Sequence, residues 1–279
     1  MSSNIRMLVV NDFDEATVVL GAGVAVPTLP ASNLQIYNNS RILRVASTEF
    51  TLVGNFADIR LISALVLWRH NLTAAATFRL ELFANANQDG ALIYDTGVLN
   101  AMPQITFGDW DWRIQPVVSS ALDSWATKYT QHWFEPKFAR SYRLTVSDEL
   151  NEAGHLDLTR IYMGRHYVPA VNFSYGSQFA FGSSETQLRT EDGGLFSQAS
   201  EVWRKVQFAL EHLNEADRPG FIAAMRHVKL SRDWFISLYP DQAGQKEIEH
   251  SFACKFTSLP AVTSVSYDRF STPITVEEC

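Results

Sequence analysis

The feature that most constrains the fold is an alternation of apolar and polar side chains with a period of two. It marks three stretches of the chain, at residues 78–82, 142–146 and 202–210. Successive side chains of a β-strand point to opposite faces, so this pattern is typical of half-buried strands. The chain is therefore predicted to be mainly β, with antiparallel sheets.

Two further patterns support this class. Residues 85–90 and 191–194, Asn-Ala-Asn-Gln-Asp-Gly and Glu-Asp-Gly-Gly, supply side chains and glycines suited to turns with positive φ. Residues 61–68 form a continuous apolar run instead of an alternating one. Such a run suits a strand covered on both faces, and we expect it at the centre of a sandwich.

One segment carries a helical pattern. Four apolar side chains share one face at helical spacing: Phe221, Ile222, Met225 and Val228. Pro219 suits the first turn of a helix, where its missing N–H costs nothing. Asn214 or Asp217 could cap the helix, and the sequence does not choose between them. We expect one short helix here.

A domain boundary is predicted near residue 168. The strand-like segment 156–164 ends shortly before Val168-Pro169-Ala170, and residues 172–178 that follow are rich in small and polar side chains. This predicts two antiparallel β domains. Residues 1–168 would form the first, and residues 169–279 the second, which carries the short helix.

Composition narrows the function classes. Apolar residues make up 46% of the chain and charged residues 19%, which is typical of a folded globular protein. The formal net charge of −7 disfavours nucleic acid as a partner, because phosphate binding needs clustered Lys and Arg. No apolar run reaches the roughly 18 residues of a membrane helix, and the first residues do not resemble a signal peptide. We therefore expect no membrane span and synthesis in a cytoplasm.

The two cysteines, Cys254 and Cys279, are too few for a disulfide framework or a thiolate zinc site. In a strand over this segment, four residues an even number apart would lie on one face: Ile248, Phe252, Cys254 and Phe256. Because the other three are apolar, the strand would point Cys254 inward. We expect a buried, inert thiol at Cys254, and we interpret Cys279, which follows Glu277 and Glu278, as a free chain end.

No catalytic, cofactor or metal residues are predicted. The chain lacks a Gly-x-Ser-x-Gly elbow, a phosphate-binding loop and a His-Glu-x-x-His helix. Gly21-Ala-Gly23 lacks a third glycine and a following helix. The seven histidines are scattered, and His70 and His166 are expected to make structural hydrogen bonds.

Asp109 and Asp111 leave one enzymatic alternative open. Residues two apart on a strand share a face, where two carboxylates could bind calcium or exchange protons. Carboxylates this close are poorly spaced to flank a glycosidic bond, and we favour a solvated loop with Arg113 nearby. A glycan-degrading enzyme is the weakest of our hypotheses.

Aromatic side chains supply the candidate site. Five of them crowd into one stretch that has few aliphatic residues and also contains Phe134: Trp110, Trp112, Trp125, Tyr129 and Trp133. Flat rings can stack on sugars or anchor a protein interface, because they offer a large contact area at low entropic cost. Core or inter-domain packing, a protein interface and glycan stacking all remain open for this set.

Five blocks resemble a known family in order and spacing: residues 31–34, 40–47, 64–72, 140–146 and 160–164. Over roughly residues 30–168 the chain resembles the galactose-binding-like jelly rolls found in bacteriophage tail proteins. It departs from that family in lacking a clear calcium loop or sugar-contacting set. The resemblance implies that residues 1–168 form a jelly-roll β-sandwich with an N-terminal lead-in strand. It implies this fold more directly than it implies glycan binding.

The second half also carries a resemblance. Four segments look like the β domain of minor tail or distal-tail proteins of long-tailed phages: residues 203–208, the helical segment, residues 234–240 and the acidic end at 270–278. That family implies a structural, non-enzymatic virion protein at the tail tip or baseplate. It would form a homo-oligomeric ring and contact the tail tube, hub and tape measure proteins. The alternative is a carbohydrate- or receptor-binding module that recognises host-surface glycans.

Overall fold

The computed structural model describes residues 4–38, 40–103, 113, 120, 122–123, 125, 127–241 and 244–279. Antiparallel strands dominate these residues, so the mainly β prediction is confirmed. The chain divides into two compact units. Unit 1 comprises Met1–Tyr167 together with Trp234–Ser251, and unit 2 comprises Val168–Asp233 together with Phe252–Cys279. In the described part of the chain, no helix has the length and apolar character needed to cross a membrane.

Unit 1 contains a large antiparallel sheet. Its strands are β2 (Val19–Ala22), β3 (Leu43–Val45), β4 (Glu49–His70), β5 (Thr77–Phe83), β6 (Leu92–Asp95), β7 (Leu99–Asn100), β8 (Tyr129–Ser147) and β9 (Leu156–Gly164). The order is β3-β9-β4-β8-β5-β6, with β2 added to β4 and β7 added to β5. Strands β5, β8 and β9 confirm the strands predicted at residues 78–82, 142–146 and 156–164.

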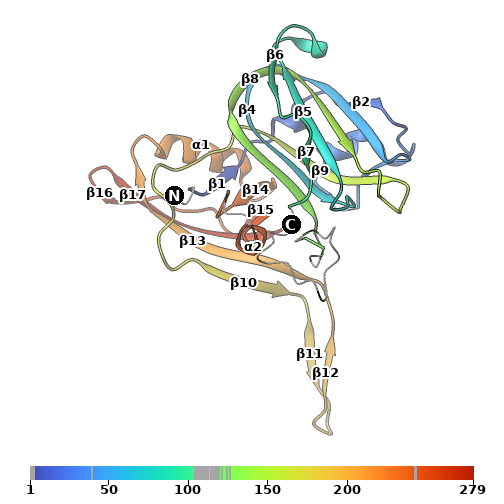
Figure 1. Cartoon of the computed structure of the whole chain (residues 1–279). Helices are drawn as coiled ribbons and strands as arrows, with labels where there is room; N and C mark the ends of the chain where they lie inside the picture. The colour runs from blue at the N-terminus through green and yellow to red at the C-terminus, as the bar shows by residue number, and fades with distance from the viewer. Residues whose placement is uncertain are drawn as a thin grey trace. The chain divides into compact units, whose positions relative to one another are not determined.

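The long strands β4 and β8 fold this sheet into two layers (Figure 1). Their register is regular from Glu49↔Ser147 to Asn55↔Ser141, breaks, and resumes from Arg60↔Ala139. Beyond the break β4 pairs with β9, whereas the last part of β8 pairs with β5. Long strands that pass from one layer to the other through an irregularity make the corners of a sandwich.

The core lies between the two layers. Apolar side chains from both meet there, and Phe13 and Leu34 add to them from the short 3₁₀ helices η1 (Asp12–Glu15) and η2 (Ala31–Gln35). A third, η3 (Ala86–Gln88), lies in the predicted turn, where Asn87 and Gly90 have φ of 59° and 78°. The other predicted turn holds Gly193 at φ 86°. Both turns therefore have the positive φ that their residues predict.

The apolar run at 61–68 is covered on both faces, as expected. Leu65 and Leu67 point into the sandwich core. On the opposite face, the ring centroid of Trp68 lies 5.8 Å from that of Tyr129 and 6.0 Å from that of Phe235. Phe235 belongs to β14 (Trp234–Ser237), which pairs with β1 (Arg6–Leu8). Residues 234–251 thus contribute to unit 1 even though they follow most of unit 2 in sequence.

The residues after β1 fasten the outer edge of β9. The Asn11 side chain donates to the Ile161 carbonyl (2.9 Å) and accepts from the Met163 N–H (2.8 Å). This side chain therefore makes the hydrogen bonds that a neighbouring strand would make to the part of β9 that β3 does not pair with. Arg160, almost fully buried, donates to Asp14 through two bonds of 2.6 and 2.8 Å.

Asp12, on the same segment, makes the stability of the protein depend on pH. Burial raises the pKa of Asp12 from 3.8 to about 6, and Arg60 only partly opposes this. The unfolded chain then releases this proton at lower pH than the folded chain. The free energy of unfolding is therefore expected to fall between pH 4 and pH 6, by at most about 3 kcal/mol, and to stay level above pH 6 as far as Asp12 is concerned.

Asp12→Asn should remove this contribution. As pH rises from 4 to 6, the free energy of unfolding of the variant should increase relative to that of the wild type. Urea unfolding at several pH values measures this difference. Glu15→Gln is the matched control, because Glu15 also pairs with Arg60 but its side chain is mostly exposed. Parallel profiles for Asp12→Asn and the wild type would contradict the assignment.

Unit 2 is built from the remaining strands and the predicted helix. They are β10 (Gln178–Ser183), β11 (Thr186–Arg189), β12 (Leu195–Gln198), β13 (Val202–Asn214), α1 (Arg218–Val228), β15 (Ser251–Phe256), β16 (Thr263–Ser266) and β17 (Arg269–Glu278). Strands pair in the order β15-β17-β13-β10. Strand β16 pairs with the start of β17, which β15 does not reach. Strand β13 confirms the alternation at residues 202–210.

Helix α1 confirms the helical prediction, with Pro219 in its first turn. Neither candidate side chain caps it. Asn214 Oδ1 instead accepts from the Asp217 N–H (2.7 Å), and Asp217 Oδ2 accepts from the Ala170 N–H (2.9 Å). The five-residue helix α2 (Gln245–Glu249) was not expected. Its segment is too short to show a helical period.

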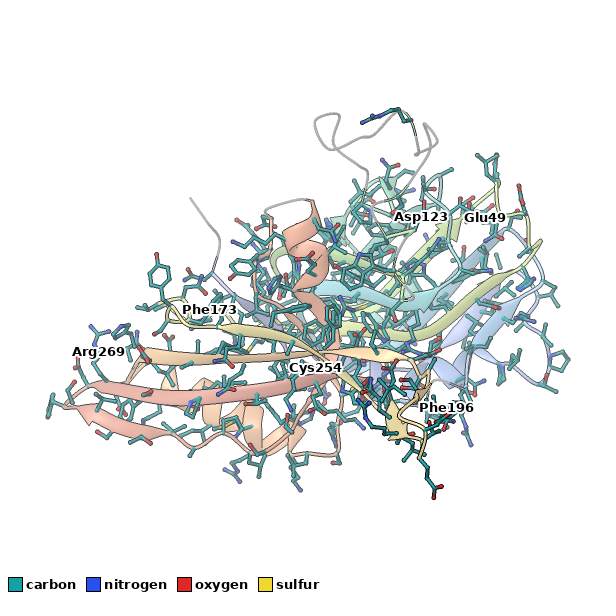
Figure 2. All side chains as sticks on the ribbon, turned by 90° about the horizontal axis from the view of Figure 1, so that it is seen from below. Glu49, Asp123, Phe173, Phe196, Cys254 and Arg269 are labelled. Atoms are coloured by element: carbon teal, nitrogen blue, oxygen red, sulfur yellow. The ribbon has the colours of Figure 1, made fainter. Side chains whose placement is uncertain are left out.

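Strands β11 and β12 form a hairpin that continues the β10–β13 pairing past the end of β17 (Figure 1). All residues of both strands are exposed. Leu188 and Phe196 face each other across the hairpin, and Phe196 is marked on it in Figure 2. A hairpin without a third strand or a covering layer is marginally stable in water.

Cys254 lies on β15 and is fully buried, as the parity of its neighbours predicts. Its side chain lies within the strand layer in Figure 2. Burial raises the pKa of the Cys254 thiol well above its ordinary value, and the nearby Cys279 adds to this. The thiol is therefore held protonated and unreactive.

A buried ion pair joins β13 to β17. Arg204 donates to Glu278 through bonds of 2.8 and 2.6 Å, and only 2% of the Arg204 side chain is exposed. The guanidinium also lies 4.9 Å from the ring centroid of Phe252. Removing one partner of such a pair leaves an uncompensated buried charge.

Glu278→Ala should therefore lower the free energy of unfolding by about 3–5 kcal/mol in urea denaturation. Glu277→Ala is the control, since Glu277 pairs with Lys205 at 2.8 Å at the surface and should cost less than about 1 kcal/mol. Equal losses in the two variants would show that the burial of the Arg204 pair carries no special weight.

Candidate functional site

Unit 1 contains a pocket of about 250 Å³. Among the residues that the structure describes, nine line it: Asn100, Ala101, Met102, Pro103, Tyr129, Gln131, Gly244, Glu247 and Ile248. Sites for drug-sized ligands typically measure roughly 300–1,000 Å³. This pocket therefore suits a smaller ligand, of the size of a single ring.

Three elements bring these residues together. Asn100 ends β7, and the three residues after it form one wall. Tyr129 and Gln131 stand two apart at the start of β8 and therefore share a face of that strand. Gly244 and Glu247 come from the start and middle of the α2 segment, which also buries Ile248.

The turn before α2 is anchored to β1. The Arg6 guanidinium forms a two-pronged ion pair with the carboxylate of Asp241, whose backbone has a φ of 62°. The Asp241 N–H donates to Glu247 Oε1 (3.3 Å), and the Tyr129 hydroxyl donates to the Ile248 carbonyl (3.5 Å). These contacts orient α2 against the start of β8 and fix the shape of the pocket.

Gln131 is the most informative residue in this pocket. Its Nε2 donates to Glu247 Oε1 at 2.6 Å. A carboxylate can only accept, so the amide nitrogen must face Glu247 and the amide oxygen must point the other way. That oxygen, Gln131 Oε1, is buried and has no hydrogen-bond partner among the residues that the structure describes.

An unsatisfied buried acceptor costs about 1–3 kcal/mol, so native structures rarely retain one without a reason. Here the acceptor belongs to a residue that lines a pocket. A ligand that carries a hydroxyl or amine donor would satisfy it. The other polar groups of the pocket, the Asn100 amide and the Glu247 carboxylate, are also able to accept hydrogen bonds.

The aromatic residues predicted from the sequence differ in their burial and in whether they line the pocket. Tyr129 lines the pocket but is only 2% exposed, packed against Trp68 and Phe235. Trp133 is half-buried, with its ring 5.7 Å from the Arg6 guanidinium and edge-on to His166.

Of the five predicted aromatics, Tyr129 is the one among the described lining residues of the pocket. Trp125 is partly buried and is absent from the lining residues. Trp110 and Trp112 lie outside the described residues, as do Asp109 and Asp111. The assignment of these aromatics to an interface or to glycan stacking therefore stays a prediction.

Sequence analysis missed Gln131, Glu247 and Asn100. One signal for Gln131 was present, because it stands between Tyr129 and Trp133 at positions that share a strand face. A polar amide between two large rings is a candidate for a partly buried, hydrogen-bonding role. Glu247 carried no comparable signal, since 116 residues separate it from its partner Gln131.

His70 and His166 make structural hydrogen bonds, as predicted. His70 Nδ1 accepts from the Leu72 N–H (3.3 Å), so its Nε2 carries the hydrogen and donates to Thr130 Oγ1 (3.1 Å). Burial lowers the pKa of His70 to about 3. The Nδ1 atom of His166 lies 2.6 Å from Ser63 Oγ. Within the described residues, no three His, Cys, Asp or Glu side chains gather closely enough to hold a metal ion.

Comparison with known proteins gives distant structural likeness only. No family model matches the chain, and no curated protein matches it in sequence. Among solved structures it is similar to chitosan-binding module 1 of a chitosanase/glucanase from Paenibacillus sp. IK-5, with 9% identity and a TM-score of 0.37 over 56% of this chain and 99% of that one.

Two other solved structures give similar values. The family 32 carbohydrate-binding module of Clostridium perfringens NanJ, in complex with galactose, has 10% identity and a TM-score of 0.37 over 58% of this chain and 98% of that one. A Streptococcus pneumoniae fucose-binding module has 12% identity and a TM-score of 0.36 over 56% of this chain and 95% of that one. At these TM-scores the likeness gives no basis for transferring a binding residue.

Proposed function

We propose that the protein is a non-catalytic carbohydrate-binding module whose binding site is the pocket of unit 1. This makes the alternative from the sequence analysis our first hypothesis. The observation that carries the proposal is Gln131 Oε1, a buried acceptor without a partner among the described residues, in a pocket of single-ring size.

Sugars match the chemistry of this pocket. A saccharide ring carries several hydroxyl donors together with apolar C–H faces. Gln131, Glu247 and Asn100 offer acceptors for the hydroxyls. Met102, Pro103 and Tyr129 supply apolar surface beside them.

A direct test is saturable binding of simple sugars to the full chain. Ligand-observed NMR with galactose, fucose and glucose would identify a binder, and calorimetry would give its dissociation constant. Gln131→Ala should weaken that binding about tenfold, because it removes one buried hydrogen bond worth about 1.4 kcal/mol.

Gln207→Ala is the matched control, since Gln207 is exposed on β13 of unit 2. It should bind sugar like the wild type. Absence of binding to any sugar of the panel, in a chain that is folded by circular dichroism, would overturn the proposal.

The second candidate is the structural virion protein suggested by the resemblance to phage tail proteins. One observation favours it: the β11–β12 hairpin leaves Leu188, Leu195 and Phe196 exposed by 64%, 57% and 61%. Apolar side chains gathered on an isolated hairpin are typical of a surface that another chain covers. Assembly into a ring at a tail tip, with tail tube, hub and tape measure proteins as neighbours, belongs to this candidate.

This candidate predicts association that depends on the hairpin. The double variant Leu188→Ser, Phe196→Ser should raise the dissociation constant of self-association about tenfold or more in sedimentation velocity, because it removes two apolar anchors. Val265→Ser is the control, since Val265 is 64% exposed on β16. A chain that stays monomeric at all concentrations would count against ring formation.

A further inference from the structure

We infer that the ligand of this module is an oligosaccharide, which spans the pocket of unit 1 and a second pocket beside it. This inference rests on the proposed function and specifies the ligand class of the same site. The second pocket measures about 260 Å³, close to the first in size. Five described residues line it, all of unit 1: Ala75, Thr77, Ser147, Glu149 and Leu150.

The two pockets are neighbours where β5 pairs with β7. Thr77 of the second pocket lies directly opposite Asn100 of the first in the register of these strands. Directly opposed residues share one face of a sheet, with Cβ atoms about 4.5–5.5 Å apart. A ligand that contacts Asn100 in the first pocket is therefore within one ring of the second.

A row of polar side chains continues from this point across the sheet. Thr77 also pairs with Ser147 of β8, and Glu49 of β4, labelled in Figure 2, lies opposite Ser147. The row thus runs from Glu49 to Asn100 over four neighbouring strands, and three strand spacings amount to about 14 Å. Phe78, next to Thr77, points into the sandwich core, so the row lies on the outer face of the sheet.

The polar groups of the second pocket are not used to hold the sheet together. In the part of the chain that the structure describes, no hydrogen bond or ion pair joins the side chains of Thr77, Ser147 and Glu149 to another residue. Two residues further along β4 and β8, by contrast, the hydroxyls of Thr51 and Thr145 lie 3.2 Å apart and bond each other. The hydroxyls and the carboxylate of the second pocket are therefore available to a ligand.

The lining of the second pocket matches a saccharide ring. The Thr77 and Ser147 hydroxyls can donate as well as accept hydrogen bonds, and the Glu149 carboxylate can accept from two hydroxyls of one ring. Ala75 and Leu150, which is 64% exposed, offer apolar surface for the C–H groups of the same ring. One ring in each pocket corresponds to a ligand of at least two linked sugars.

The experiment compares sugars of increasing length. Glucose, cellobiose and cellotriose, and in parallel galactose, galactobiose and galactotriose, are titrated into the full chain by calorimetry. In the series that binds, the disaccharide should bind at least tenfold more tightly than the monosaccharide. The second ring is held next to its pocket once the first ring is bound, so its contacts are gained at a high effective concentration.

Methyl NMR spectra of the full chain locate the added ring. Met102 lines the first pocket, whereas Ala75 and Leu150 line the second. The Met102 methyl signal should shift with the monosaccharide and with the disaccharide. The Ala75 and Leu150 methyl signals should shift with the disaccharide only.

The double variant Thr77→Val, Glu149→Gln tests the second pocket itself. It removes a hydroxyl and a charge with little change of shape, and it should reduce the affinity gain from monosaccharide to disaccharide at least fivefold. Thr51→Val, Glu152→Gln is the matched control. Thr51 already bonds Thr145, and the exposed Glu152 is not among the described lining residues of either pocket. The control should keep the gain of the wild type.

The outcomes separate this inference from the proposed function. Equal affinities for monosaccharide and disaccharide in both series would overturn the oligosaccharide inference and leave the binding of single sugars standing. Ala75 and Leu150 signals that stay unshifted at saturation with the disaccharide, or an unchanged gain in the double variant, would do the same. Absence of binding to every sugar would overturn both.

Discussion

The structure of unit 1 depends on one packing interaction, the burial of Phe235 against the outer face of β4 and β8. Its ring lies about 6 Å from those of Trp68, Tyr129, Trp133 and Tyr162, at 6.0, 5.8, 6.1 and 6.3 Å between centroids. Aromatic rings bury large areas, and such clusters dominate the packing energy where they occur. This cluster holds residues 234–251 on the sandwich. Without it, α2 would have no fixed place beside β8.

The candidate site is a consequence of that packing. Arg6 and Asp241 orient the turn before α2, but the turn reaches Arg6 only because β14 pairs with β1. Glu247 then meets Gln131, and the amide of Gln131 is turned so that its oxygen remains without a partner among the described residues. Leaving this acceptor unpaired costs about 1–3 kcal/mol, which the packing of the surrounding layer can offset.

Sequence analysis predicted what short-range patterns determine. The alternation in β5, β8 and β13, the run at 61–68 and the helix α1 all follow from side-chain periodicity, which the local backbone directly expresses. The turn at Gly193 follows from the special conformational freedom of glycine. These features gave the fold class, helix α1 and some of the strands of both units.

The site could not be predicted in the same way. Glu247 and Gln131 come together only after residues 234–251 have packed on the sandwich, and no local pattern encodes that return of the chain. Tyr129 was named from its residue type alone, whereas its contact with the pocket depends on the register of β8 against β4. The five-residue α2 is shorter than any window in which a helical period is visible.

The discontinuity of unit 1 also sets an order on its biosynthesis. A ribosome makes the chain from the amino end, and domains generally begin to fold as they emerge. The sandwich strands through β9 are complete once Gly164 has been made, but Phe235 and Ile248 are added much later. Until then Trp68 and Tyr129 lack their contacts with this segment. The nascent chain therefore exposes an apolar surface at this face of the sandwich while most of unit 2 is being translated.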